Sequence, residues 1–158
     1  MVEPAEYRRP SAAFRWFART PELAFRLGLG GLFRRRLCML THRGRATGLP
    51  RRTVLEVVEE DRARRTVVVA SGFGVSQWLR NLRANPPLRL DIGTEHGVPT
   101  ARELDPAEAA KVLSRYQLAH PRAARALGQK LLGAPFDGSP GSAQALAEQT
   151  PMVELRLP

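Results

Sequence analysis

The stretch "LCMLTHRGRATGLPRRTVLEVV", residues 37–58, places a strongly basic segment between two apolar runs. The flanking segments, 37–41 and 53–58, are rich in the aliphatic and β-branched residues that strands favour. Two glycines, a proline and four arginines stand around the centre, and glycine and proline are turn formers. The stretch therefore predicts a β-hairpin with a positively charged tip.

The charge at this tip has two interpretations. It belongs either to a solvated turn or to a fixed site for an anion such as a phosphate or a carboxylate. A glycine-bearing turn can aim backbone N–H groups at an anion, and Arg45 and Arg51 on either side of it offer guanidinium forks. The hairpin alone leaves both interpretations open.

The order of the remaining elements indicates the fold class. Apolar patterning and turn residues predict strands at 66–70, 88–92, 98–104 and 152–157, and helices at 77–85, 107–119, 121–132 and 142–149. We expect Ser76 to cap the first of these helices and Ser142 to begin the last. Because strands and helices do not alternate regularly, we expect a mainly β (α+β) fold with an antiparallel barrel or sheet of about six strands.

The N-terminal part carries most of the charge. The formal net charge is +10, and residues 1–65 hold 15 of the 25 basic groups but only 7 of the 15 acidic ones. We expect a basic amphipathic helical arm at 1–36 and one domain at 37–158. Aromatic residues and leucines alternate with arginines within 8–36, which suits peripheral contact with an anionic membrane. The alternative is that these apolar side chains pack over the domain or in a homodimer.

Several classes of protein lack support in the sequence. Cys38 has no partner for a disulfide and suits a small buried hydrophobe, and no apolar run is long enough to span a membrane, so we expect a cytoplasmic protein. The three histidines are scattered, which predicts surface or boundary positions and no metal site. No G-x-S-x-G elbow, phosphate loop or nucleic-acid reading helix is present, and charge alone supports only non-specific binding of nucleic acid.

A second group of residues that suits ligand binding follows the strand at 66–70. Ser71, Gly72 and Gly74 in "ASGFG" would let a ligand approach the backbone closely. Trp78 and Asn81, three positions apart on one face of the next helix, pair an aromatic plane with an amide. The alternative is that Trp78 belongs to the core and Asn81 is a cap or surface residue.

These segments together resemble the deazaflavin-dependent nitroreductase and quinone reductase family. "THRGRATGLPRRT" is similar to the T-x-x-G-R-x-[ST]-G-x-x-R hairpin of that family, and "VVVASGFGVSQWLRNLRANP" is similar to its strand, loop and W-x-x-N-L-x-A-x-P helix. The resemblance continues through "LDPAEAAKVLSRYQLAHPRAARALGQKLLG", "DGS" and "TPMVELRLP". It covers nearly all of residues 37–158, with the motifs in the family's order.

The resemblance implies a split β-barrel, related to flavin-binding barrels, with helices before the first strand and before the last. It implies the deazaflavin coenzyme F-420, with FMN less favoured, and transfer of a hydride from the reduced coenzyme to a quinone, a nitroaromatic or an activated enone. The basic tip would then bind the phosphate or the acidic oligoglutamate tail of the coenzyme. By position, the resemblance assigns coenzyme binding to Arg45, Thr47, Gly48, Arg51, Ser71, Gly72, Trp78 and Asn81.

Two departures from the family pattern bear on affinity and substrate. Ala46 stands where many relatives have lysine, which removes one cationic contact. His120, Ala123 and Ala126 lie where nitro-reducing members carry tyrosines, which disfavours nitro reduction. No side chain is assigned as catalytic, and water, Ser71 and Tyr116 stay open as proton donors. The alternative function is a non-catalytic split-barrel binder of flavin, heme or a fatty acyl ligand.

Overall fold

The structure is a computed structural model that describes residues 35–71 and 74–158. Of the expected arm at 1–36, only Arg35 and Arg36 fall within this range, so the prediction of a helical arm lies outside the described residues. Gly72 also lies outside them.

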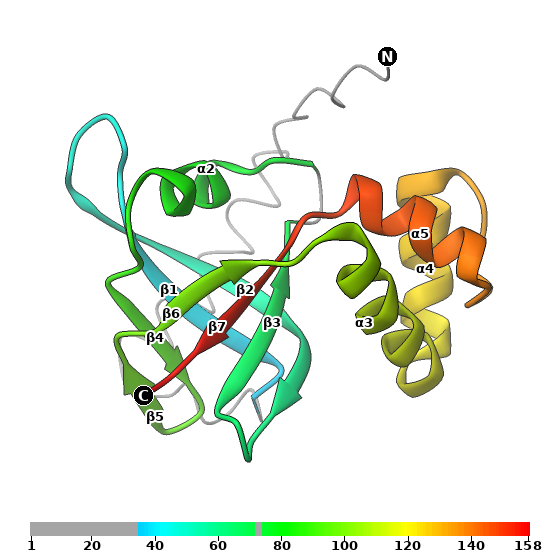
Figure 1. Cartoon of the computed structure of the whole chain (residues 1–158), viewed down its shortest axis with the longest axis horizontal. Helices are drawn as coiled ribbons and strands as arrows, with labels where there is room; N and C mark the ends of the chain where they lie inside the picture. The colour runs from blue at the N-terminus through cyan, green and yellow to red at the C-terminus, as the bar shows by residue number, and fades with distance from the viewer. Residues whose placement is uncertain (1–34, 72–73) are drawn as a thin grey trace.

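The described part of the chain contains one antiparallel sheet of seven strands in the order β5-β4-β1-β2-β3-β7-β6 (Figure 1). The strands are β1 (Leu37–Arg43), β2 (Pro50–Asp61), β3 (Thr66–Ala70), β4 (Arg89–Ile92), β5 (Glu95–Gly97), β6 (Thr100–Glu103) and β7 (Met152–Arg156). The predicted hairpin is confirmed, because β1 pairs with β2 and places His42 opposite Arg51.

Strand β2 bends and pairs with β1 along its first part and with β3 along its last part. Its register with β3 shifts between Val57 and Glu59, which marks a β-bulge or irregularity. Residues 50–56 pair with β1, whereas Val57 and residues 59–61 pair with β3. A bulge bends a strand and increases its twist, so the twelve residues of β2 turn the sheet back on itself.

The two edge strands of the sheet are neighbours in the sequence. β5 and β6 lie at opposite ends of the strand order, yet only Val98 and Pro99 separate them. Three peptide units reach roughly 10 Å, so the two edges must lie close together and the sheet must curl into a barrel. The fold is therefore the split β-barrel that the family resemblance implied.

The strand expected at 98–104 is present as β6, but the sequence did not predict β5, which precedes it. β5 lies before the predicted range and pairs with β4, whereas β6 pairs with β7. Pro99 lies in the gap and has no backbone N–H with which to continue a ladder. The chain therefore changes partners at this point, and the sheet has one strand more than expected.

Alternating side chains separate two cores. In β3, Val67 and Val69 face a core inside the barrel, whereas Val68 faces a second core on the outer surface of the sheet. Helix α2 (Gln77–Ala84) contributes Trp78 and Leu79 to the inner core. Helices α3 (Pro106–Ala119), α4 (Pro121–Leu132) and α5 (Pro140–Gln149) form a layer over the outer one (Figure 1).

The helices begin close to where the sequence predicted them. Asp105 and Glu108 form a reciprocal capping box at the start of α3. Helix α5 begins at Pro140 and not at Ser142, because the side chain of Ser139 caps it by accepting the Ser142 N–H at 3.3 Å. Pro140 at the first helical position needs no donor there, so Ser139 and Pro140 together fix the earlier start.

Cys38 is fully buried in the inner core, where burial raises the pKa of its thiol to about 12. This confirms the prediction that it acts as a small hydrophobe. No helix within residues 35–71 and 74–158 is long and apolar enough to cross a membrane.

Candidate functional site

The tip of the β1–β2 hairpin is a turn closed by its own backbone. The N–H of Gly44 donates to the carbonyl of Leu49 at 2.9 Å, and the N–H of Gly48 donates to the carbonyl of Gly44 at 2.8 Å. Gly48 has a φ of 70°, in the left-handed region that favours glycine. Thr47 Oγ1 accepts the N–H of Leu49 at 3.3 Å. Thr47 and Gly48 therefore shape the turn.

Gly44 leaves room for the side chain of Arg51 to lie against the turn. A Cβ atom at this position would lie 2.8 Å from Thr47 Oγ1 and 2.9 Å from Arg51 Nε. Real Cβ atoms essentially never approach so closely, so a larger residue would displace one of these groups. The glycine holds space for a guanidinium at the base of the turn.

Helix α2 is bonded to this turn through Asn81. The Oδ1 atom of Asn81, whose residue is 3% exposed, accepts the backbone N–H of Arg45 at 3.1 Å and its Nη1 at 3.0 Å. One amide oxygen thus fixes both the backbone and the guanidinium of Arg45. The interpretation of Asn81 as a helix cap or surface residue is excluded by this burial.

Ser71 fixes the loop that leads into α2. Its Oγ accepts the N–H of Ser76 at 3.0 Å and donates to the carbonyl of Gly74, and its own N–H donates to the carbonyl of Pro151 at 2.8 Å. Ser76 occupies the predicted N-cap position, but its Oγ is buried and has no hydrogen-bond partner. The start of the helix is therefore held by Ser71 and not by a side-chain cap.

These elements enclose a pocket of about 230 Å³ between the hairpin tip and α2. Its lining consists of one glycine, one alanine, two arginines, a threonine and two amides: Gly44, Arg45, Ala46, Thr47, Arg51, Gln77 and Asn81. Four of the predicted site residues are thereby brought together. Gln77, in the first turn of α2, was missed because only the closure of the helix onto the hairpin places it there.

The hairpin arginines keep their charge available. Among the described residues, no carboxylate forms an ion pair with Arg43, Arg45, Arg51 or Arg52. Arg43 donates to the carbonyl of Gly48 at 2.9 Å, and Arg45 is held by the neutral amide of Asn81. The pocket lining contains no acidic residue, so its electrostatics favour an anion.

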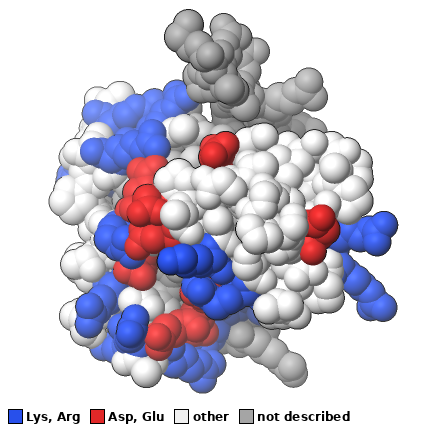
Figure 2. Space-filling model, turned by 45° about the vertical axis from the view of Figure 1, so that its right-hand side comes forward, with Lys and Arg blue, Asp and Glu red and all other residues white. Residues whose placement is uncertain are grey.

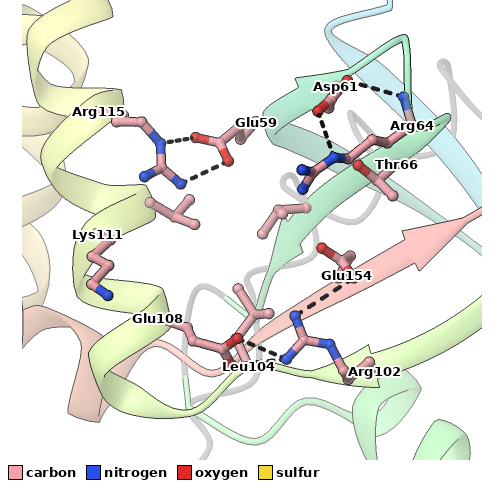
Figure 3. A pocket seen from close by; sticks show the side chains of 12 residues that line it. Glu59, Asp61, Arg64, Thr66, Arg102, Leu104, Glu108, Lys111, Arg115 and Glu154 are labelled. Atoms are coloured by element: carbon pink, nitrogen blue, oxygen red, sulfur yellow. Dashed lines mark hydrogen bonds and ion pairs between the residues drawn. The ribbon is translucent and has the colours of Figure 1, made fainter.

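A larger pocket of about 290 Å³ lies on the other side of the sheet, against α3 (Figure 3). There Arg115 contacts Glu59 through two hydrogen bonds of 2.6 and 2.9 Å, and Arg102 contacts both Glu108 and Glu154. Figure 2 shows acidic and basic side chains next to one another on one face, and a broad uncharged area on the right where the helices come forward. Most charges of this pocket neutralise one another, so it is a weaker candidate for an anion site.

The other predicted residues lie apart from the pocket lining. Trp78 is 7% exposed and packs in the inner core, while Ser71 is 1% exposed and supports the loop. Tyr116, on α3, packs against the outer core, where burial and the nearby Glu56 raise the pKa of its hydroxyl. Neither of the two side chains considered as proton donors lines the pocket beside the hairpin.

The sequence also failed to predict the position of His42. This residue was expected at the surface or a boundary, but it is 4% exposed at the end of β1, and its Nδ1 lies 3.1 Å from Asn81 Nδ2. Burial, and secondarily the charge of Arg51, lowers the pKa of His42. Its inward direction follows from the alternation of β1, in which Cys38 and Leu40 also face the inner core. That alternation was the available signal.

The fold and this site define a split-barrel protein with a pocket that is lined by two arginines and no carboxylate beside the hairpin tip. The model of the F-420H(2)-dependent quinone reductase family matches residues 22–130 of the chain. The chain therefore belongs to that family, and it is an F-420H(2)-dependent reductase.

Solved structures agree in fold. An F-420-H2 dependent reductase is 20% identical with a TM-score of 0.50, and the match covers 77% of this chain and 95% of that one. A protein described as a domain-swapped dimer is 18% identical with a TM-score of 0.52, covering 92% and 100%. A member of the pyridoxinephosphate oxidase family from Clostridium acetobutylicum is 12% identical with a TM-score of 0.50, covering 85% and 84%. At these identities the comparisons support the split-barrel fold.

Proposed function

We propose that the pocket between the hairpin tip and α2 binds the phosphate or the acidic oligoglutamate tail of coenzyme F-420, and that the chain reduces a small-molecule acceptor. The observation that carries this proposal is that Arg45 and Arg51 have no carboxylate partner among the described residues. Both line a pocket without carboxylates, and Arg45 is fixed by a buried amide that leaves its positive charge unneutralised.

The residues present fit an anionic group of this kind. Guanidinium forks bind phosphate and carboxylate oxygens through paired hydrogen bonds, and their strength rises when they are held in place beforehand. Gly44 keeps open the space in which Arg51 lies, and the amide of Gln77 adds a polar group to the pocket lining. Family membership favours this enzyme over a non-catalytic binder of flavin, heme or a fatty acyl ligand.

The protein contributes binding and orientation to the reaction. When bound, the reduced deazaflavin supplies a hydride, and this chemistry needs no nucleophilic side chain. Arg45 and Arg51 would anchor the acidic end, while Thr47 and Gly48 shape the turn. Trp78 and Asn81 are proposed, with Ser71 and Gly72, to line or support the deazaflavin end. For Trp78 and Ser71 the observed burial favours a supporting role through α2 and its loop.

Among acceptors, we propose a quinone ahead of a nitroaromatic or an activated enone. The family that the chain belongs to is described as a quinone reductase family. The helix α4 presents alanines at 123 and 126 where nitro-reducing members carry tyrosines. Steady-state assays with reduced F-420 and matched quinone and nitroaromatic acceptors test this preference.

The central test is titration of the purified protein with oxidised F-420, followed by fluorescence, for the parent and for Arg45→Ala and Arg51→Ala. Each variant loses charge-assisted hydrogen bonds worth about 1.5–3 kcal/mol, so we expect binding to weaken roughly ten- to a hundredfold. The loss should shrink at high salt because ions screen the pairing.

A matched control removes one positive charge, as the two test variants do, but at a position away from the pocket. Arg64→Ala removes an arginine whose side chain is 80% exposed near the β2–β3 turn, and we expect F-420 binding to be unchanged. Equal affinity for F-420 in the parent and in both pocket variants would overturn the assignment of the anion site.

Two further proposals concern partners. We propose that residues 8–36 contact anionic membrane, which suits a quinone acceptor, because their basic and aromatic pattern matches an interfacial segment. Co-sedimentation with vesicles of phosphatidylglycerol at low salt tests this, and full-length protein that stays in the supernatant argues against it.

We also propose a homodimer, since one protein of the same fold is described as a domain-swapped dimer. Sedimentation analysis tests that proposal.

A further inference from the structure

We propose that His42 is a positioning residue of the anion pocket. The unprotonated Nδ1 of its imidazole holds Asn81 in the orientation that lets Asn81 fix Arg45. The consequence for coenzyme binding rests on the function proposed above. His42 itself does not line the pocket, so its effect would pass through Asn81.

The orientation of the Asn81 amide is determined by its partners. The backbone N–H and the guanidinium of Arg45 can only donate hydrogen bonds, so the atom that both contact must be the acceptor Oδ1. The amide nitrogen Nδ2 then faces His42. Because Nδ2 can only donate, Nδ1 of His42 must accept, and the neutral ring carries its proton on Nε2.

Protonation of the imidazole would break this arrangement. A proton on Nδ1 would face the two N–H bonds of Nδ2, so the 3.1 Å contact could not persist as a hydrogen bond. A rotation of the amide that satisfied His42 would turn the NH2 group toward the donors of Arg45. In either case Asn81 no longer fixes both Arg45 and His42, and the guanidinium in the pocket loses part of its support.

The surroundings of His42 favour the neutral ring. Arg51 faces it from β2 as its register partner, Arg43 follows it on β1, and α2 presents the uncharged Asn81. On β4, Arg89 is next to the neighbouring Thr41 but is paired with Asp91 at 2.8 Å. No carboxylate among the described residues lies within ion-pair distance of the ring. We therefore expect protonation only at a pH below the usual range of histidine.

The test compares F-420 affinity from about pH 5 to about pH 8.5 in the parent and three variants. The affinity of the parent for F-420 should fall about three- to tenfold at the acid end of this range. This is the effect expected from the loss of one hydrogen bond, the one between His42 and Asn81, because Asn81 holds Arg45 in the pocket. His42→Gln offers Asn81 a carbonyl acceptor that does not titrate, so its affinity should stay near the neutral-pH parent value at every pH. His42→Leu offers none and should bind about three- to tenfold more weakly throughout.

His96→Gln is the matched control. His96 is exposed on β5, so this variant should follow the pH profile of the parent. If His42→Gln retains the acid-dependent loss, the pH effect does not come from His42 and the inference is overturned. A second check uses Arg45→Ala as background, in which His42→Leu should cause no additional loss of affinity. Additive losses in the double variant would contradict action through Arg45.

A measurement without coenzyme separates this inference from the proposed function. Nitrogen-15 NMR of the full chain should show the Nε2–H tautomer of His42 near neutral pH, and acidification should shift the Asn81 amide and the Arg45 guanidinium together. An Nδ1–H tautomer overturns the inference even if F-420 binds tightly. Conversely, the expected spectra with no binding of F-420 by the parent would overturn the proposed function and leave the role of His42 standing.

Discussion

Arg45 shows how a protein can fix a cation without neutralising it. A carboxylate partner would hold the guanidinium equally well, but the pair would attract an anion far less. The amide of Asn81 accepts both the backbone N–H and Nη1 of Arg45 and carries no charge. Its 3% exposure shields these hydrogen bonds from water, which gives them more weight than at the surface. The pocket therefore keeps both geometry and charge.

Ala46 is the position at which the affinity of this pocket should be easiest to raise. It stands between Arg45 and Thr47 in the sequence and lines the pocket. Ala46→Lys adds a cation on an exposed turn, so we expect F-420 to bind about two- to tenfold more tightly at low salt, with a smaller gain at high salt. Fluorescence titration at two salt concentrations measures this. Ala46→Gln controls for side-chain length, and an equal gain there would show that charge is not the cause.

Gly44 tests whether the position of Arg51 matters beyond its charge. Gly44→Ala brings a Cβ within 2.9 Å of Arg51 Nε and 2.8 Å of Thr47 Oγ1, so one of them must move. We expect F-420 affinity to fall about tenfold while the circular dichroism spectrum stays unchanged. Gly141→Ala is the control, because a Cβ there meets nothing within 4 Å. Unchanged affinity in Gly44→Ala would mean that Arg51 does not need this position.

At the residue scale, the sequence predicted the arginines and Asn81 as site residues and missed His42, which contacts Asn81. The positions of Arg45, Arg51 and Asn81 could be predicted because the hairpin and helix motifs have fixed spacing. The contact between His42 and Asn81 could not, because it joins residues 39 positions apart and depends on how α2 closes onto β1. The alternation of β1 indicates that His42 faces the same side as Cys38 and Leu40, but it does not identify Asn81 as its partner.

At the scale of elements, the loop that precedes α2 carries a matched pair of serines. Ser71→Ala removes the acceptor of the Ser76 N–H and the donor to the Gly74 carbonyl, and it leaves these groups without that partner. We expect the free energy of unfolding to fall by about 1–3 kcal/mol. Urea titration followed by circular dichroism measures this value for each variant.

Ser76→Ala supplies the comparison at the same helix end. Its Oγ is buried without a partner, so its removal should leave the free energy of unfolding within about 0.5 kcal/mol or raise it. A loss in Ser76→Ala as large as that in Ser71→Ala would show that the N-cap hydroxyl supports α2 in solution, contrary to the contacts seen here.

The elements themselves were largely predictable, and the strand partners were not. Helices α3 and α4 begin at prolines after clear boundaries, so their limits could be predicted from local sequence. β5 was missed because its three residues are too few to show a strand pattern, and the local sequence around β6 carries no marker of the strand with which it pairs. Pairing is decided by closure of the barrel, which is a property of the whole sheet.

At the scale of the whole molecule, the barrel has two different ends. The pocket, the hairpin tip and α2 form one end. At the other, Arg35 contacts Glu60 of β2 at 2.5 Å and Glu95 of β5 at 2.8 Å. Arg65, in the turn between β2 and β3, contacts Glu95 at 3.3 Å and donates to the carbonyl of Pro158. The contacts of Arg35 and Arg65 with Glu95 connect β5 to the β2 end of the sheet, and β5 is not a neighbour of β2 or β3, so they support the closure of the barrel opposite the site.

The ionisation of Glu95 makes the stability contributed by these contacts depend on pH. Its partial burial acts to raise the pKa of the carboxyl group, but the charges and hydrogen bonds of Arg35 and Arg65 outweigh it and hold the pKa below the usual range. A carboxylate whose pKa is lowered by folding contributes stability above the pKa of the unfolded chain. That contribution is lost as the pH falls through the lower pKa of the folded protein. Part of the acid sensitivity of the molecule should therefore come from Glu95.

Glu95→Gln tests this contribution. The side chain is 39% exposed, so solvent screens the ion pairs, and we expect a loss of a few tenths to about 1 kcal/mol near neutral pH. Below the lowered pKa the parent carboxyl is neutral too, so the difference in the free energy of unfolding should narrow as the pH falls from about 7 to about 3.5. Glu148→Gln, an exposed residue of α5 without an ion pair among the described contacts, should match the parent at each pH. A difference in the free energy of unfolding that stays constant over this range would contradict an electrostatic role. Protonation removes the charge of Glu95 in the parent, so an electrostatic contribution has to decrease at low pH.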